Sequence, residues 1–450
     1  MTGDAAGAIG RRGPAIAGPI PSAGPIPRLR LRDPTPDLLA LPWGRPLEVW
    51  DADGADLRFR ELPVGPSRHV VRFLETERGL LALKDEPLPI ADREYEVLRH
   101  LEEAGLPVVS PVGVAAVAER GSAILVTAYL TGSLQYRRLL SRFPPGPSPM
   151  RDRLLDAMAG LLVDLHRGGV YWGDCSLANT LFRRDGDKIQ AYLVDAETSE
   201  VHPGLSDGQR AYDLDVLVEN VAFGLADLAA AAGRDDLLDE SVAAAEGVCD
   251  RYRALWDELH AEEELAGDDR HAVAARIRRL NDLGFAVDEI ELQPGSAGRV
   301  RLRVAVTNRR FHARELQRRT GIVALEGQAT LLLNDLREYR SWLERREGRK
   351  IDRPEAAQRW LDEVFEPTVE RLRPAIGPGR DPVQAYCDVL ETKWLLSERA
   401  GRDVGLEAAV TAYLEMGAPA PEVGAPEVGA SETGASEPAG PEEVGRGPRP

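Results

Sequence analysis

The sequence predicts an α+β protein with two lobes, in which a small β-rich lobe precedes a larger helical lobe. Three patterns support this: short β-rich runs around one helix in the first third, a long helical stripe after them, and a mostly helical last third. The chain has 450 residues, of which 43% are hydrophobic, so it is long enough for two or three domains with a substantial core.

The small lobe is predicted over residues 42–131. Residues 69–84, HVVRFLETERGLLALK, contain two β-rich runs around a Glu-Arg-Gly turn, which is typical of a hairpin. Residues 92–105, DREYEVLRHLEEAG, begin with an Asp suited to capping and place Tyr95, Leu98 and Leu101 on one helical face. Further strands are expected within 109–118 and 122–130, so the order is strand, strand, helix, strand, strand.

The helical lobe is predicted over residues 132–250. Apolar residues at i, i+1, i+4, i+7, i+8 and i+11 from Leu154 to Leu165 form the stripe of a buried helix. Residues 180–195, TLFRRDGDKIQAYLVD, read as a strand, an Asp-Gly turn and a strand, and a further helix is expected around 212–223.

A mostly helical domain with one hairpin is predicted over residues 251–416. Helices are expected within 226–290 and over 316–348, with a hairpin at 288–308 that turns at Pro-Gly-Ser. The helical face of Leu332, Leu336, Tyr339 and Leu343 is interpreted as core rather than as a partner groove. The two ends, 1–36 and 417–450, are rich in Gly and Pro and are expected to be disordered.

Charge and composition exclude several classes of function. The formal net charge of −18 disfavours general binding to nucleic acid or to anionic membranes. Three cysteines in no metal-ligand spacing fit a reducing compartment, and no segment has the length of a membrane span. Arg11-Arg12 resembles a twin-arginine signal, but prolines interrupt the stretch that follows, so a cytoplasmic location is expected.

Polar residues at strand ends fit the chemistry of phosphoryl transfer from ATP. That reaction requires a cation on the nucleotide phosphates, oxygen ligands for Mg²⁺ and a carboxylate near the acceptor hydroxyl. Lys84 ends the run LLALK, and Glu94 on the next helix is placed to hold its ammonium. Taken alone, these two residues read equally as a solvated Lys and a surface Glu.

The stretch WGDCSLANTLF, residues 172–182, places an acid and an amide five residues apart between two apolar segments. Asp174 would orient the proton of the acceptor, and Asn179 would offer an amide oxygen to magnesium. Asp195 ends the next hairpin, and its carboxylate is a hard oxygen ligand of the kind Mg²⁺ prefers. Each residue alone also fits a turn or a strand end.

Together these motifs resemble the protein-kinase-like fold over residues 60–225. LALK is similar to the kinase VAIK, LHRGGVYWGDCSLANTLF to LHxxGIxHRDxxxxN, and LVDAET stands where DFG would be. The stretch is most similar to lipopolysaccharide-core sugar kinases and to the small kinase-like ATPase of the tRNA threonylcarbamoyl-modification complex. Residues 42–400 also resemble a family from high-GC bacteria described as a domain of unknown function.

The resemblance implies a two-lobed protein-kinase-like fold that binds ATP and Mg²⁺. It implies these roles: Lys84 on the phosphates, Glu94 as its partner, Asp174 as catalytic carboxylate, Asn179 and Asp195 as metal ligands, and Asp213 as the buried acid that holds the catalytic loop. Asp213 also fits a helix cap.

The sequence departs from the kinase pattern in its phosphate loop and beside its catalytic residues. The glycine-rich loop is replaced by VGPSRHVV, in which Gly65 and Arg68 are the candidates for phosphate contact. Trp172-Gly173 replaces the family's His, and Glu197 in place of the family's Gly is either a ligand of a second metal or a loop acid. Cys175 is expected to be a packing residue and His166 a hydrogen-bonded core histidine.

The short sequence separation between Asp195 and Asp213 limits the class of acceptor that the protein is expected to phosphorylate. These 18 residues leave no room for a long activation segment, so the expected acceptor is a hydroxyl of a small molecule, glycan or lipid-linked molecule, or of the protein itself. The alternative is a nucleotide-binding pseudokinase or ATPase-like scaffold. A third hypothesis is a polyanion-binding adaptor that uses the segment Arg299–Arg319, which contains eight arginines and one acidic residue. The alternative for this segment is a ladder of arginines that are solvated or neutralised within the protein.

Overall fold

The computed structural model describes residues 28–51, 57–62, 64, 68–117, 120–266, 269–295, 299–377 and 379–419. Most of the two segments predicted to be disordered lies outside these residues. Residues 28–31 are a correction, because they form the strand β1 (Arg28–Leu31) and pair with β5. Alternation in RLRL turns Leu31 toward the hydrophobic core while Arg28 and Arg30 reach carboxylates on the neighbouring helix.

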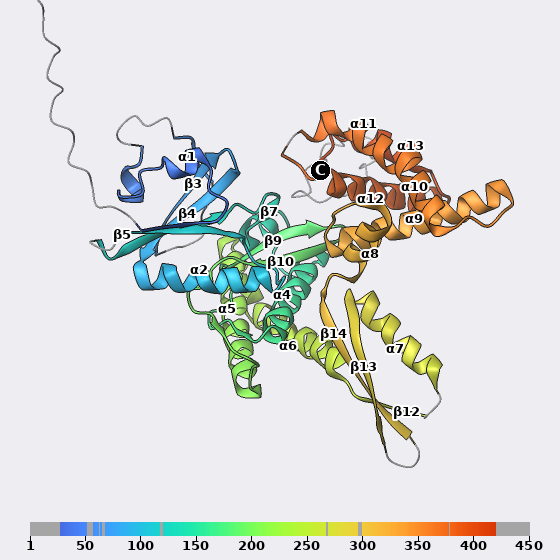
Figure 1. Cartoon of the computed structure of the whole chain (residues 1–450), viewed down its shortest axis with the longest axis horizontal. Coiled ribbons are helices and arrows are strands. Elements are labelled where there is room, and N and C mark those ends of the chain that lie inside the picture. Colours follow the sequence, from blue (N-terminus) through green and yellow to red (C-terminus); the bar gives the residue numbers. More distant parts are fainter. Residues whose placement is uncertain are drawn as a thin grey trace, which may run out of the picture.

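The small lobe is a six-stranded antiparallel sheet with the strand order β1-β5-β6-β4-β3-β2. Its other strands are β2 (Phe59–Arg60), β3 (Val70–Thr76), β4 (Gly79–Pro87), β5 (Pro111–Val117) and β6 (Ser122–Ala128). The short helices α1 (Pro36–Leu39) and a 3-10 turn (Leu47–Val49) cover one face with Trp43 and Trp50. The long helix α2 (Leu88–Glu103) covers the other face (Figure 1).

Helix α2 begins at Leu88, five residues before the start that a cap at Asp92 predicts. Pro87 precedes its first turn, and Pro89 occupies the second helical position, where a missing N–H costs nothing. Asp92 is therefore not a cap; its carboxylate pairs with Arg28 at 2.5 Å. Tyr95, Leu98 and Leu101 are buried on one face, as predicted.

The helical lobe surrounds the core that α4 (Pro149–Arg167) carries through its centre. Its other elements are β7 (Ser133–Leu134), α3 (Tyr136–Leu140), β8 (Val170–Tyr171), β9 (Thr180–Asp185), β10 (Lys188–Leu193), β11 (Glu200–Val201), α5 (Asp207–Ala231), a 3-10 turn (Asp235–Leu237) and α6 (Leu238–His260). The strands β7, β9 and β10 form one small sheet, and β8 pairs with β11.

The last third of the chain differs from its prediction in two places. Elements here are β12 (Glu263–Ala266), α7 (Arg270–Asp282), β13 (Phe285–Pro294), β14 (Arg299–Arg309), α8 (Phe311–Thr320), α9 (Glu326–Glu347), α10 (Arg353–Trp360), a π-helical turn (Leu361–Phe365), α11 (Glu366–Ile376), α12 (Pro382–Ala400) and α13 (Leu406–Glu415). The single helix expected over 316–348 is two helices, because Gly321 in the left-handed conformation ends α8. Residues 263–266, within a segment expected to be helical, form a strand against β14.

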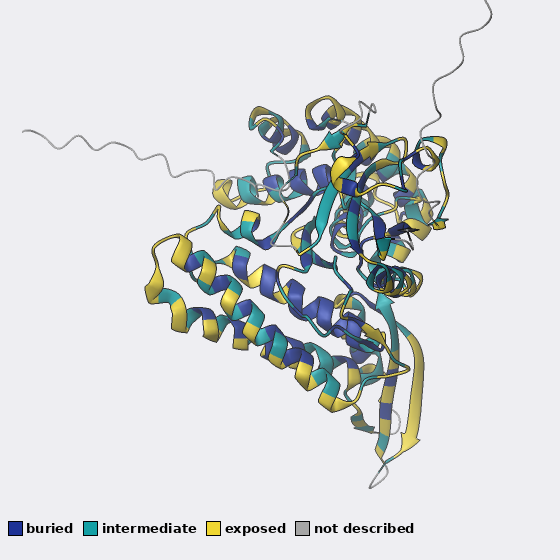
Figure 2. Ribbon diagram, turned by 90° about the vertical axis from the view of Figure 1, so that its left-hand side faces the viewer, coloured by how far each residue is buried: buried dark blue, intermediate teal, exposed yellow. Residues whose placement is uncertain are grey.

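The predicted domain boundary at residue 250 falls inside α6. Tyr252 and Leu259 of this helix, and Leu302 of β14, belong to the same core as the helical lobe. A separate core holds α8 to α12, where Leu332 and Leu336 are buried as predicted; Leu343 is buried beside it, against Ile351 and Ala356. Figure 1 shows the helices α9 to α13 grouped apart from the β13–β14 hairpin, and Figure 2 shows the buried stripes of the long helices.

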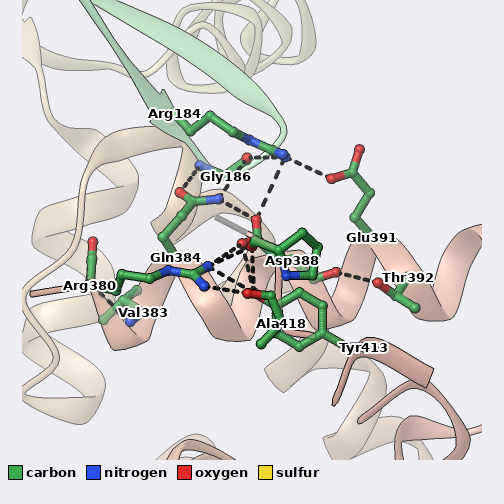
Figure 3. Close-up of polar contacts among 12 residues, drawn as sticks. Arg184, Gly186, Arg380, Val383, Gln384, Asp388, Glu391, Thr392, Tyr413 and Ala418 are labelled. Carbon is green, nitrogen blue, oxygen red and sulfur yellow. Dashed lines mark hydrogen bonds and ion pairs between the residues drawn. The ribbon is translucent and has the colours of Figure 1, made fainter. Parts of the chain in front are cut away.

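The tip of the β9–β10 hairpin is bound by the C-terminal helices (Figure 3), and we call this contact the hairpin clamp. Backbone N–H of Gly186 donates to Gln384 Oε1 at 3.0 Å, and Gln384 Nε2 donates to the Gly186 carbonyl at 3.1 Å. Arg184 donates to Glu391 at 2.7 Å. The Asp185 carboxylate accepts the N–H groups at the start of α9, those of residues 327 and 328, at 2.9 and 2.8 Å.

Two glycines allow this close approach. Gly186 has φ +66°, and a Cβ on it would lie 2.9 Å from the backbone of Gly327; a Cβ on Gly327 would lie 2.2 Å from the Asp185 carbonyl oxygen.

Within the part of the chain that the structure describes, no helix combines the length and apolar character needed to cross a bilayer.

Candidate active site

One cavity between the two lobes gathers the residues that the sequence predicts to act together. Its volume is about 290 Å³, and its walls come from β3, β4, α2 and the segments that flank β9 and β10. Lys84, Glu94, Asp174, Asn179 and Asp195 all line it. Val71, Phe73, Ala82 and Leu125 supply an apolar wall, as sites for small ligands commonly have.

The Lys84 ammonium lies at the centre of a buried charge cluster. Its Nζ is 2.9 Å from Glu94 Oε2, 3.2 Å from Asp195 Oδ2 and 3.0 Å from Glu86 Oε2. Burial alone would lower the pKa of Lys84, but the three carboxylates raise it above its ordinary value. Lys84 is therefore a fixed cation that faces the cavity.

Glu94 joins this cluster to the segment after Asp195. Its Oε1 accepts the backbone N–H of Ala196 at 3.2 Å while its Oε2 accepts Lys84. Burial, together with the negative charge of Asp195, raises the pKa of Glu94 to about 8, against the attraction of Lys84.

This shift predicts a pH dependence of stability. Because the pKa of Glu94 is about 8 in the folded protein and 4.5 in an exposed chain, the folded state holds the extra proton between these values. The free energy of unfolding should therefore fall as the pH rises from 4.5 toward 8. This pH-dependent decrease in the free energy of unfolding should be absent from Glu94→Gln. It should remain in Glu96→Gln, which changes an exposed residue of the same helix. Urea unfolding across this pH range measures the difference, and parallel curves for wild type and Glu94→Gln would contradict the assignment.

Asp174 is held by two asparagine side chains. Asn179 Nδ2 donates to Asp174 Oδ2 at 2.9 Å, and Asn220 Nδ2 donates to Asp174 Oδ1 at 3.2 Å. Asn220 also donates to the Cys175 carbonyl at 3.0 Å, so helix α5 fixes the loop as well as the carboxylate. Both oxygens of Asp174 thus have a set direction on the cavity wall.

The two predicted metal ligands flank one hairpin. Asn179 immediately precedes β9, and Asp195 follows β10 by two residues, so strand pairing returns the chain to the same wall. The backbone N–H of Val194 donates to the Asn179 carbonyl at 3.1 Å, which fixes the two segments side by side. Because the amide nitrogen of Asn179 is used by Asp174, its side-chain oxygen is the atom left for a cation.

Asp213 lies beneath the loop, fully buried, as the sequence predicts for an anchor. Its two oxygens accept the backbone N–H groups of Trp172 and Gly173, each at 2.8 Å. Gly173 has φ +80°, and a Cβ there would lie 3.0 Å from the Thr198 carbonyl oxygen, so this position favours glycine. His166 is a buried histidine bonded to Asp213 at 3.0 Å and to the Tyr252 hydroxyl at 2.8 Å, as expected for a core residue.

The phosphate-loop candidates are placed only in part. Gly65 lies outside the described residues. Arg68 lines the cavity but is 82% exposed, and its guanidinium pairs with Glu197 at 2.5 Å. Cys175 is fully buried and burial raises its thiol pKa, which fits a packing role.

Much of the Arg299–Arg319 segment is neutralised within the protein. Five of its eight arginines pair with carboxylates: Arg299 with Glu264, Arg301 with Glu262, Arg309 with Asp164, and Arg318 and Arg319 with Glu315. The structure therefore favours the internally neutralised ladder over a free polyanion surface.

Three further residues of the site were missed by sequence analysis. Asn220 is one of several polar residues in a mixed helix, and nothing in its local pattern marks it as a neighbour of Asp174. The sequence does contain a signal for Glu86, because Glu86 is two residues after Lys84 in the same strand and its side chain therefore lies on the same face of the sheet as that of Lys84. His69 lies opposite Glu86 and needs the strand register to be recognised.

Comparisons with known proteins agree with this geometry. A model described as the lipopolysaccharide kinase (Kdo/WaaP) family matches residues 75–222, and one described as a domain of unknown function (DUF4032) matches residues 254–417. The first match runs from β3 into α5 and includes Lys84, Asp174 and Asp195. It confirms the predicted resemblance and the kinase-like α+β fold, and it supports the class of kinase-like phosphotransferases.

One curated relative and one solved structure carry the same family name. The lipopolysaccharide core heptose(I) kinase WaaP of Pseudomonas aeruginosa (strain PAO1) is 27% identical over 157 residues, which are 32% of this chain and 56% of that protein. This chain thus spans about half the length of the curated relative that it matches. The structure described as WaaP in complex with acyl carrier protein aligns with 51% of this chain and 99% of that chain, with 20% identity and a TM-score of 0.32.

Proposed function

We propose that this chain is an ATP- and Mg²⁺-dependent phosphotransferase that phosphorylates a hydroxyl group. The observation that carries the proposal is the convergence of Lys84, Asp174, Asn179 and Asp195 on one cavity, although they are distant in sequence. A cation, an acid fixed by two amides and a pair of oxygen ligands are the groups that phosphoryl transfer requires.

In the proposed reaction each residue has one task. Lys84, held by Glu94, binds the phosphates of ATP and neutralises their charge. Asp174 orients the acceptor hydroxyl and accepts its proton as the hydroxyl oxygen bonds to the terminal phosphorus and the bond from that phosphorus to ADP breaks. Asn179 and Asn220 keep the carboxylate of Asp174 directed, so its position does not depend on the substrate.

The donor set fits Mg²⁺ at Asn179 and Asp195. A carboxylate and an amide oxygen are hard ligands, and Asn179 presents its oxygen because Asp174 accepts its nitrogen. Asn179 and Asp195 would hold the ion, which when bound would supply positive charge that offsets the charge developing on the phosphates. Lys84 Nζ donates a hydrogen bond to Asp195 Oδ2 at 3.2 Å, and the backbone N–H of Glu197 donates one to Asp195 Oδ1 at 3.1 Å. These two bonds orient the carboxylate of Asp195 without a bound ion.

The acceptor is proposed to be a sugar hydroxyl, in a glycan or a lipid-linked glycan. The family description of residues 75–222 supports this class. The segment between Asp195 and α5 also supports it, because residues 196–206 include β11, whose pairing with β8 turns the segment back against the lobe. Ser199 and Thr198 hydroxyls bond the Trp172 carbonyl at 3.3 and 2.9 Å, so little chain remains to support a bound peptide.

Thermal unfolding with nucleotide tests the proposal. The melting temperature of the wild-type protein should rise by several degrees with saturating ATP and Mg²⁺ and by less with ATP alone, because a ligand that binds only the folded state stabilises that state. Asp195→Asn should lose the part of the gain that depends on Mg²⁺. A surface control, Asp187→Asn, whose side chain is exposed, should respond as wild type does. The proposal is wrong if ATP and Mg²⁺ leave the wild-type transition unchanged.

A further inference from the structure

A second group of ligating side chains lies beside Lys84, on the same face of the sheet. Val70 pairs with Asp85 and Val71 with Lys84, so continuing the register by one residue places His69 opposite Glu86. Glu197, two residues after Asp195, reaches the same point from the other lobe. One ligand atom from each of His69, Glu86 and Glu197 lies within 4.8 Å of the other two, and we call this group the His69 triad.

Glu86 is the unusual member of the triad, because its side chain is fully buried and poorly satisfied. Neither carboxylate oxygen accepts a hydrogen bond from any residue that the structure describes. Lys84 Nζ is 3.0 Å from Glu86 Oε2, but its hydrogen bonds go to Glu94 and Asp195. The ammonium of Lys84 offsets part of the cost of burying Glu86, and a bound cation would offset the remainder of that cost.

Glu197 contributes a second oxygen of the same kind. Its Oε1 accepts Arg68 at 2.5 Å, whereas its Oε2 is buried, accepts no hydrogen bond from the described residues and lies 3.4 Å from His69 Nε2. Two such oxygens and an imidazole nitrogen therefore converge. Four carboxyl groups in this part of the cleft, those of Glu86, Glu94, Asp195 and Glu197, lie near two cations, Lys84 and Arg68.

We propose that His69, Glu86 and Glu197 form a second cation site, which takes a divalent transition metal of the Mn²⁺ or Zn²⁺ class and is separate from the Mg²⁺ position at Asn179 and Asp195. Imidazole favours these metals, whereas Mg²⁺ favours oxygen ligands and retains its water. Metal bonds of about 2.0–2.2 Å place ligands roughly 3 Å apart. His69 Nε2 and Glu197 Oε2 are 3.4 Å apart, and binding would require the Glu86 and Glu197 side chains to rotate so that the three ligand atoms, which lie within 4.8 Å of one another, approach this spacing.

Three protein ligands leave coordination positions open toward the cavity that His69 and Glu197 line. A phosphate oxygen or water is the expected further ligand, so the ion would compensate for the missing glycine-rich loop by adding positive charge at that end of the cleft. Occupation of the site itself needs neither nucleotide nor turnover.

Mn²⁺ binding to the full-length protein without nucleotide tests this site. Pulsed electron paramagnetic resonance of bound Mn²⁺ should show coupling to a ¹⁴N nucleus in wild type and none in His69→Gln. Titration should show Mn²⁺ affinity at least about 10-fold weaker in Glu86→Gln and in Glu197→Gln, because each removes one ligand charge. His202→Gln is the matched control, since His202 also lies beside a glutamate, at 3.3 Å from Glu200.

The two metal proposals separate in the same experiment. Asn179→Ala should keep the ¹⁴N coupling and the Mn²⁺ affinity without nucleotide, whatever its effect on phosphoryl transfer. The proposed triad is overturned if the coupling persists in His69→Gln, or if wild type, Glu86→Gln and Glu197→Gln bind Mn²⁺ equally. Because Glu86 is buried, thermal unfolding confirms that its variant is folded, and the less buried Glu197 gives the same test without disturbing the sheet.

Discussion

An Asp174→Asn variant is expected to lose phosphoryl transfer by about three orders of magnitude while it still binds nucleotide, because general-base contributions are typically about 10²–10⁴-fold. The amide keeps the size of the carboxylate but cannot accept the acceptor's proton. It also places an NH₂ group against the donors of Asn179 and Asn220, so one of these contacts at 2.9 and 3.2 Å is lost.

The measurement is turnover of labelled ATP with a sugar acceptor, alongside nucleotide binding by calorimetry. Asp187→Asn removes the same charge from an exposed position on the hairpin turn and should retain wild-type turnover. Equal turnover in Asp174→Asn and wild type would exclude Asp174 as the base. Equal loss of nucleotide binding and turnover would instead indicate a folding defect.

Replacing Asp213 with alanine should destabilise the protein by about 3–5 kcal/mol, since removing one partner from a buried charged network leaves the other groups without acceptors. The backbone N–H groups of Trp172 and Gly173 and the ring of His166 all direct hydrogen bonds to this carboxylate. The loop that carries Asp174 would lose two backbone hydrogen bonds to a buried carboxylate, so turnover should fall together with stability.

Urea unfolding of Asp213→Ala and Asp213→Asn measures this effect. The asparagine variant retains one acceptor oxygen and should lose less stability than the alanine variant. Asp215→Ala is the control, because Asp215 lies two residues away on α5 with its side chain exposed. A stability of Asp213→Ala within about 0.5 kcal/mol of wild type, the range of ordinary surface substitutions, would exclude the anchor role.

The strand-end residues of the site were predictable from the sequence because their order along the chain carries the signal. Lys84 ends the continuous apolar run LLAL, and the Asp-Gly turn between β9 and β10 implies that Asp195 returns toward Asn179. These inferences need only local pairing, which hairpin patterns specify well.

Contacts between distant elements were not predictable in this way. Asn220 reaches Asp174 only because α5 packs against the loop, and His69 meets Glu197 only when the lobes face one another. The strand at residues 263–266 was missed because its pattern is overridden by pairing with β14. The predicted boundary at residue 250 falls inside α6, which continues without a break across it.

The hairpin clamp has a consequence for how the C-terminal region relates to catalysis. One end of the β9–β10 hairpin carries Asn179 and Asp195. At the other end, Arg184 and Gly186 form hydrogen bonds with residues of α12. Six residues of strand make this hairpin a stiff lever of about 20 Å. A partner that shifts α12 is therefore expected to move Asn179 and Asp195 together relative to the small lobe, and a chain shortened to remove residues 326–419 would keep both residues but lose the contacts that hold the hairpin tip.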